Sequence, residues 1–171
     1  MHYIRVVQKF LLFGLLTSTL VSCSSWLETR VSHRLVEIDS LSFPYVYSYN
    51  KEPFNGIVEI RNDDDSLLEE MYISDGIQQG PHRIYDTTGY IKAEKNMTNG
   101  VQDGISTYYR PDGKVSQTHE FVQGRLGGKS IFYHKNGKVR LLMQFSPSGK
   151  KSGTWYEYDL QGNIIKETHH P

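Results

Sequence analysis

The sequence has few of the residues that build cross-linked or nucleic-acid-binding proteins. One Cys in 171 residues excludes an internal disulfide framework and a multi-cysteine zinc site. The 19 basic and 19 acidic residues balance, so the basic excess typical of nucleic-acid binders is absent and no nucleic-acid partner is expected. The length suits one modest domain or one repeat array, with no room for a catalytic domain beside a substrate domain.

Motifs for catalysis, cofactors and metals are also missing. No G-x-S-x-G motif appears, and Gly128-Lys129-Ser130 lacks the upstream glycine of a phosphate-binding loop. His169-His170 is the only histidine pair at close spacing, and we interpret it as a frayed tail. Asp63-Asp64-Asp65 offers hard oxygens for Ca²⁺ but lacks the rest of an EF-hand loop, which favours a solvated acidic turn. We therefore expect no enzyme, no cofactor and no metal.

No apolar run is long enough to cross a membrane as a helix, which needs ~20 apolar residues. Residues 1–22 instead have the layout of a secretory signal, with Arg5 and Lys9 before the short apolar core Phe10 to Leu16. The segment ends in Leu20-Val21-Ser22-Cys23.

This ending resembles the bacterial lipobox, with an aliphatic residue, a small residue at Ser22 and then Cys23. The resemblance implies cleavage between Ser22 and Cys23, a diacylated Cys23 thiol and an acylated new N-terminus. The partner implied is the membrane, reached through this lipid. Ser24 favours the outer membrane if the host has two membranes, and with one membrane the anchor is its outer face. An ordinary signal peptide with a chance Cys is the alternative.

Residues 23–52 are expected to form a lipidated tether and an N-terminal cap. Phe43 to Tyr49 is rich in β-formers, with Tyr45, Tyr47 and Tyr49 on one face. This stripe is an alternative ligand surface, but packing of the cap on the first repeat is favoured.

Glycine is abundant, with 15 residues, and it repeats. Between residues 53 and 171, five units spaced by 24, 24, 24 and 25 residues begin at Gly56, Gly80, Gly104, Gly128 and Gly153. An aromatic residue follows five positions later at Tyr85, Tyr109, Tyr133 and Tyr158. A second glycine follows at Gly89, Gly113, Gly137 and Gly162, and a third at Gly76, Gly100, Gly124 and Gly149. Such a period indicates a repeat architecture.

Each unit has the pattern of a β-hairpin. Pro111-Asp112-Gly113 and Asn136-Gly137 are turn signals between alternating segments. Gly-x-x-x-Gly is interpreted as a link to the next hairpin. The predicted fold is all-β: an elongated antiparallel meander of about ten strands in a single-layer, twisted sheet. Lys150-Lys151 and the polar tail from His169 are expected to guard its edges.

The motif G-x4-Y-x2-[DN]-G-[KN]-[VI]-x5-F-x2-G resembles the MORN-repeat variant of bacterial YwqK-type proteins, over Pro53 to about Ile165. The resemblance implies the same hairpin array, and members of this group carry an antitoxin-like label. The tyrosine series is interpreted as half-buried packing, with stacking on a ligand as the alternative.

Two function classes remain. The favoured one is a membrane-anchored, non-enzymatic interaction or scaffold module at the cell envelope, with a protein partner or, as an alternative, a glycan. The other is an envelope carbohydrate-active or wall-remodelling factor, which needs paired carboxylates. Glu69, Glu70, Glu94 and Glu120 are spread along the array without evident convergence. An antitoxin or immunity role rests on the family label alone.

Overall fold

A computed structural model describes residues 30–32, 36–39 and 42–171. The predicted signal segment and its cleavage and lipidation residues, Ser22 and Cys23, lie outside the described residues.

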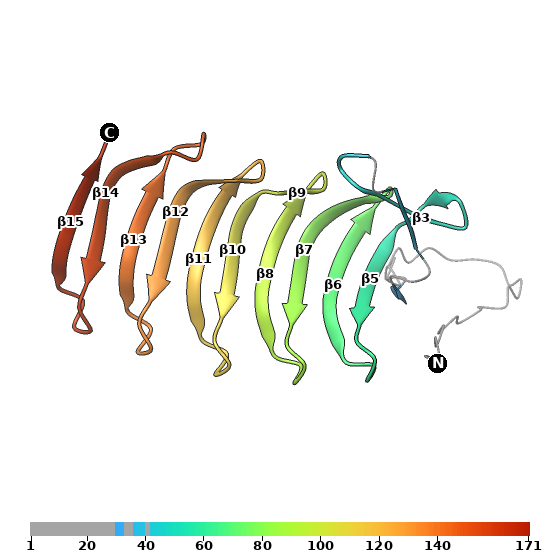
Figure 1. Ribbon diagram of the computed structural model, residues 1–171, viewed down its shortest axis with the longest axis horizontal. Coiled ribbons are helices and arrows are strands. Elements are labelled where there is room, and N and C mark those ends of the chain that lie inside the picture. The colour runs from blue at the N-terminus through green and yellow to red at the C-terminus, as the bar shows by residue number, and fades with distance from the viewer. Residues whose placement is uncertain (1–29, 33–35, 40–41) are drawn as a thin grey trace, which may run out of the picture.

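The predicted meander is confirmed. Ten strands form five consecutive antiparallel hairpins within one sheet, and the sheet is not closed into a barrel (Figure 1). The hairpins are β5 (Gly56–Arg61) with β6 (Leu67–Ser74), β7 (Ile77–Tyr85) with β8 (Ile91–Thr98), β10 (Gly104–Tyr109) with β11 (Val115–Val122), β12 (Arg125–Tyr133) with β13 (Val139–Phe145), and β14 (Lys151–Tyr158) with β15 (Ile164–His170).

Two further short strands complete the sheet of twelve. β1 (Arg30–Ser32) pairs with β5 in parallel, which the sequence pattern did not predict. β9 (Val101–Gln102) pairs with the end of β8 just before β10 begins. The two edge strands of the sheet are therefore β1 and β15.

The glycines adopt the backbone conformation that their repeat positions require. All thirteen glycines of the three repeat positions have positive φ, and Gly127, which lies outside those positions, does not. In the β10–β11 turn, Gly113 N–H donates to Arg110 O at 2.9 Å and Arg110 N–H donates to Lys114 O at 2.8 Å. The first hairpin has Asp65 where the others have glycine, and Asp65 also has positive φ, at 65°. The spacing of the hairpins thus follows the positions where the backbone needs a positive φ, which glycine adopts most easily.

The interpretation of the Gly-x-x-x-Gly segments as links was wrong for three of the four, because β7, β12 and β14 begin before the second glycine, whereas β10 does begin at Gly104. Asp75 and Gly76 alone form the turn between β6 and β7, and β7 continues through Gly80. Met71 pairs with His82 but Ile73 pairs with Gln78, so three residues around Gly80 oppose one residue of β6. Such a bulge bends a strand, and the strands curve visibly along their length (Figure 1).

The cap packs on the first hairpin. β2 (Glu37–Asp39), β3 (Val46–Tyr49) and β4 (Glu52–Pro53) form a separate three-stranded sheet. Tyr47 is 6% exposed, whereas Tyr45 is 53% exposed, so the tyrosine stripe is not a uniform surface. Tyr47 N–H donates to Gly76 O at 2.7 Å, which ties β3 to the β6–β7 turn. The buried cluster comprises Val36, Tyr47, Phe54, Val58, Met71 and Ile73.

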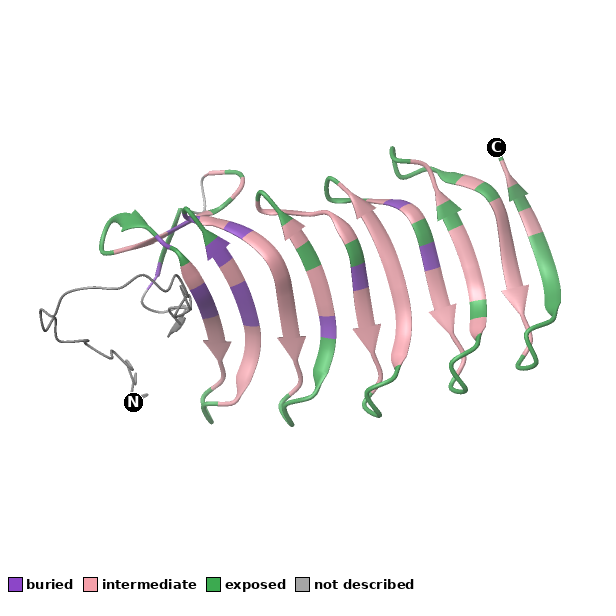
Figure 2. Cartoon of the chain, turned by 180° about the vertical axis from the view of Figure 1, so that it is seen from behind, coloured by how far each residue is buried: buried purple, intermediate pink, exposed green. Residues whose placement is uncertain are grey.

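Burial is concentrated at this end of the sheet (Figure 2). Between β8 and β15 the buried side chains are small, namely Ala93, Ser106 and Ser130. The remainder of the array is held mainly by strand pairing between neighbours, as expected of a quasi-one-dimensional repeat protein.

Two predictions about the C-terminal end were wrong. Lys151 begins β14, one strand inside the edge, so Lys150-Lys151 does not guard an edge strand. His169 and His170 are not a frayed tail, because they pair with Thr154 and Gly153 in the β14–β15 ladder. The tail instead continues the sheet to its last residues.

Candidate functional site

The strand register separates two faces of the sheet. Val58, Met71, His82 and Lys95 pair in one row, and the register of β8 with β10 continues the row through Ser106, His119, Ser130 and Met143 in the later strands. We call the face that carries His82, His119 and Trp155 the histidine face. The opposite face carries Glu70, Arg83 and the tyrosine series, and we call it the tyrosine face.

The tyrosine series is half-buried, which agrees with its interpretation as packing. All four residues have intermediate exposure, namely Tyr85, Tyr109, Tyr133 and Tyr158. Tyr85 Oη donates to Glu70 Oε2 at 3.3 Å. Tyr156 and Tyr158 place their ring centres 6.3 Å apart in the last hairpin. These residues lie along the tyrosine face and stay partly accessible.

Two of the four glutamates singled out in the sequence do meet, but they meet at an arginine. Arg83 Nη1 lies 3.1 Å from Glu70 Oε2, and Arg83 Nε lies 2.8 Å from Glu94 Oε2. Hydrogen bonds to Glu94 and Glu70 hold the pKa of Arg83 above its ordinary value despite some burial. Glu70 is 4% exposed. This group is an ion-pair cluster across three strands rather than a pair of carboxylates facing a cleft.

The other two glutamates lie apart from that cluster. Glu69 Oε2 lies 2.8 Å from His82 Nε2, on the histidine face. Glu120 Oε2 accepts a hydrogen bond from Lys129 N–H at 3.0 Å, beside the bulge at Gly128. Each therefore has a local structural partner, and the geometry does not bring the four together.

The histidine face carries a row of aromatic rings across β10, β11 and β12. Tyr108 and His119 place their ring centres 5.5 Å apart, and His119 and Phe132 place theirs 5.3 Å apart, both edge to face. His119 Nδ1 lies 3.0 Å from Ser130 Oγ. Burial lowers the pKa of His119. All three rings keep intermediate exposure, so the row is ordered and still reachable from outside.

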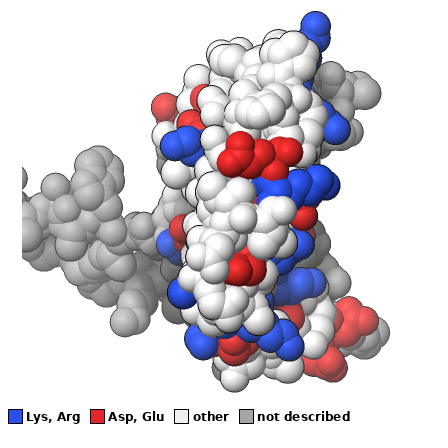
Figure 3. Space-filling model, turned by 90° about the vertical axis from the view of Figure 1, so that its left-hand side faces the viewer, with Lys and Arg blue, Asp and Glu red and all other residues white. Residues whose placement is uncertain are grey.

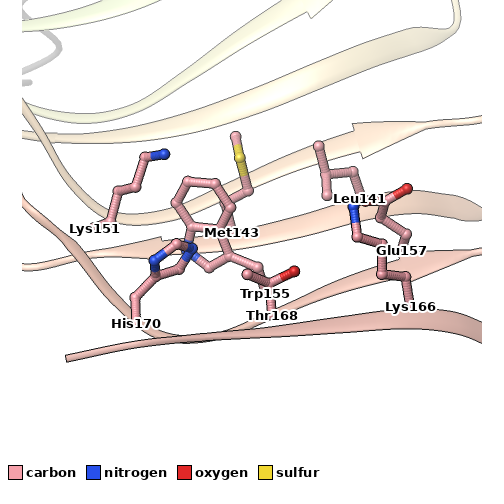
Figure 4. A pocket seen from close by; sticks show the side chains of 8 residues that line it. All are labelled: Leu141, Met143, Lys151, Trp155, Glu157, Lys166, Thr168 and His170. Carbon is pink, nitrogen blue, oxygen red and sulfur yellow. Dashed lines mark ion pairs between the residues drawn. The ribbon is translucent and has the colours of Figure 1, made fainter.

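A second aromatic group lies on β13, β14 and β15 (Figure 4). Trp155 stands between Phe145 and His170, with ring centres 5.4 Å and 4.3 Å away. Lys151 Nζ lies 4.9 Å from the centre of the Trp155 ring, a cation–π contact. Trp155 Nε1–H donates to Gln144 O at 3.0 Å, which fixes the indole on the sheet.

This group lines a hollow of about 270 Å³, whose apolar floor is Leu141, Met143 and Trp155 (Figure 4). A second hollow of about 250 Å³ lies beside it and shares Leu141 and Glu157. Glu157 pairs with Lys166 at 3.0 Å and is the one carboxylate in the lining of either hollow. These hollows therefore lack the paired carboxylates that glycoside hydrolysis needs.

The sequence reading missed Trp155 and His170. His170 follows Gly153 by 17 residues, just as Phe121 follows Gly104 and Phe145 follows Gly128. The repeat period therefore contained the signal that His170 occupies a strand position normally held by an apolar residue. The interpretation of His169-His170 as a frayed tail left this repeat position of His170 unnoticed.

Within the described part of the chain, no group of three His, Cys, Asp or Glu side chains is arranged to hold a metal ion. In that same part, no helix is long and apolar enough to cross a membrane.

One hairpin matches a known family model. Residues 126–146, which span most of β12, the following turn and all of β13, match the model described as MORN repeat variant. This segment is a MORN repeat variant. No curated protein matches the chain in sequence.

The other hairpins share the geometry of this MORN-variant unit. Each has a register shift where its first strand reaches the hairpin turn: between Ile60 and Arg61, Ile84 and Tyr85, Tyr108 and Tyr109, and Glu157 and Tyr158. The matched unit has it between Phe132 and Tyr133. The five hairpins of the sheet thus share the same register shift at the end of their first strand.

Proposed function

We propose that this chain is a membrane-anchored, non-enzymatic interaction module that binds a protein partner at the cell envelope through the histidine face. The observation that carries the proposal is the partly exposed row of Tyr108, His119 and Phe132 on three adjacent strands.

The physical argument concerns exposed aromatic surface. Soluble monomers rarely present large contiguous apolar patches unless something binds there. Aromatic residues and methionine are enriched at the centres of protein interfaces. Here Phe132 pairs with Leu141, and Ser130 pairs with Met143, so the aromatic row continues into an apolar one. Because the rings stand on paired strands, little conformational entropy is lost when a partner covers them.

The membrane part of the proposal rests on the sequence. Cys23 follows a lipobox-like segment, and acyl chains at that residue would hold the array at a membrane surface. Cys23→Ser is expected to move the protein from the membrane fraction to the soluble fraction. A variant that stays with the membrane would contradict the lipid anchor.

The binding part is tested with the full chain recovered from native envelopes. After mild cross-linking, the wild type is expected to bring down one partner reproducibly, and Phe132→Ser is expected to lose it. Ile131→Ser is the matched control, because Ile131 is the preceding residue and faces the other side of β12. Equal recovery by Phe132→Ser and the wild type would contradict binding through the histidine face.

A further inference from the structure

We infer that the hollow around Trp155 takes an acidic peptide segment that inserts one large apolar side chain. The inference rests on the proposed function, since it names the chemistry of the partner at one end of the same face. Four observations support it: the apolar floor of the hollow, the cations around that floor, the charge distribution of the chain and one buried nitrogen.

The floor of the hollow is suited to an apolar side chain. Leu141, Met143 and Trp155 form it, and Met143 adapts its shape easily because its side chain is unbranched. The hollow, at about 270 Å³, is below the roughly 300–1,000 Å³ of pockets that enclose whole small-molecule ligands. A single side chain presented by a larger partner therefore fits better than a free ligand.

Cations surround this floor. Lys151 is exposed and stands over the Trp155 ring. Arg140 lines the adjoining hollow and lies 5.6 Å from the centre of the Phe132 ring. Lys166 is already paired with Glu157. Lys151 and Arg140 are thus the cations available to carboxylates that flank an inserted side chain.

Charge is unevenly distributed along the chain. Residues 101–171 contain ten Lys and Arg against six Asp and Glu, a net charge of +4. Residues 24–100 contain seven against thirteen, a net charge of −6. On the end of the molecule that carries β15, Lys and Arg side chains lie beside Asp and Glu side chains and uncharged atoms (Figure 3). An acidic segment is therefore drawn to the half of the array from β9 to β15 and repelled from the other half, and Lys151 and Arg140 are the local cations at the hollow.

His170 adds an unused polar atom. Its Nε2 is buried and has no hydrogen-bond partner among the described residues, while its ring lies 4.3 Å from Trp155. When Nε2 carries the proton, it is a donor without an acceptor, and a backbone carbonyl or carboxylate of an incoming segment supplies that acceptor.

A glycan is the weaker fit to this hollow. Sugars present hydroxyl groups, which need polar partners once they leave water. The floor offers two aliphatic or thioether side chains and an indole whose N–H is already donated to Gln144 O, and of the polar side chains in the wall, Glu157 and Lys166 are already paired with each other. An apolar peptide side chain loses no hydrogen bond there.

The test uses the full chain in detergent with Trp26→Phe, which leaves Trp155 as the only tryptophan. Selection from a random library of short displayed peptides is expected to enrich sequences with Asp or Glu around one Leu, Phe or Met. The enriched peptide, made synthetically, is expected to change Trp155 fluorescence on binding and to bind more weakly as salt is raised. Enrichment of basic or purely polar sequences would overturn the inference.

Charge reversal locates the site. Lys151→Glu combined with Arg140→Glu is expected to weaken binding of that peptide by about tenfold or more, which is a modest loss for two charges beside a ligand. Lys92→Glu is the matched control, because Lys92 is exposed and occupies the repeat position of Arg140 two units earlier. It is expected to leave the affinity unchanged, and an equal loss in both variants would contradict a local site.

Further binding measurements on the same protein distinguish two other occupants of the hollow around Trp155. Binding of an acidic oligosaccharide with no response to the peptide would assign the hollow to a glycan. Sedimentation that shows dimers, lost on Lys151→Glu, would assign it to a second copy of this chain. Either result overturns the inference. If Phe132→Ser still abolishes partner recovery from envelopes, the proposed function stands without it.

Discussion

Glu120 fills the space that a side chain at Gly128 would need. A Cβ built on Gly128 would lie 2.1 Å from Glu120 Oε2, the oxygen that accepts the hydrogen bond of Lys129 N–H. Gly128 also has a φ of +102°, a backbone conformation that residues other than glycine rarely adopt. The bulge at this position is thus fixed by a glycine and by the carboxylate of the facing strand.

Gly128→Ala is therefore expected to lower the free energy of unfolding by about 2 kcal/mol, from backbone strain and from loss of the hydrogen bond of Lys129 N–H when the Glu120 carboxylate moves aside. Gly137→Ala is the control, since it has positive φ but no atom within 4 Å of a new Cβ. The control is expected to lose only about 1 kcal/mol of strain. Urea denaturation followed by circular dichroism compares them, and equal losses would mean that Glu120 plays no part.

Arg83→Met is expected to destabilise the chain because it leaves Glu70 buried without its cation. The expected loss in the free energy of unfolding is about 2–3 kcal/mol, below the largest values for buried pairs because the Arg83 side chain is 30% exposed. Lys166→Met breaks an exposed pair with Glu157 and is expected to cost less than about 1 kcal/mol. Thermal unfolding of the two variants compares their losses in the free energy of unfolding. A larger loss for Lys166→Met than for Arg83→Met would refute this ranking.

Stability is expected to fall as the pH drops below about 6.5, the ordinary pKa of histidine. Burial lowers the pKa of His119, and it lowers that of His82 despite the neighbouring Glu69. Because the unfolded chain then binds protons more readily, the contribution of these histidines is complete above the unfolded pKa and is lost as the pH falls through the folded one.

The measurement is the free energy of unfolding across about pH 5.5 to 7.5, the window around the ordinary histidine pKa. The variant carrying both His82→Asn and His119→Asn is expected to show a shallower slope than the wild type. An unchanged slope would show that other groups control this titration.

Deleting residues 104–127 is expected to leave a folded array of four hairpins. The cut joins Asp103 to Gly128, so the first strand of one unit is replaced by that of the next in the same register. Repeat arrays tolerate loss of an internal unit with reduced stability. Removing residues 104–115 instead deletes β10 and its turn, and this variant is expected to misfold. Cooperative β-type unfolding of the short deletion alone would contradict the repeat account.

The fold was predictable because the glycines act locally. Gly113 and Gly137 mark turns whose dihedral angles depend on a few neighbouring residues, so the spacing alone gives ten strands in order. The parallel pairing of β1 and the bulge at Gly80 were not predictable, since both depend on which residues face one another across strands.

The candidate site was less predictable, because it too depends on which residues face one another across strands. Lys151, Trp155 and His170 come together only when β14 and β15 pair in one register, and the terminal histidines carry no motif of their own. Conversely, Glu70 and Glu94 looked dispersed along the chain but share Arg83 across three strands. The lipid anchor at Cys23 stays a prediction, because it lies outside the described residues.

The most direct test of the account is site-specific photo-cross-linking in the cells that make the protein. A photoreactive residue is placed either at Phe132, on the histidine face, or at Ile131, on the opposite face of the same strand. The account predicts a discrete covalent adduct with a protein from Phe132 and none from Ile131. Adducts from Ile131 alone, or none from either position, would contradict binding through the histidine face.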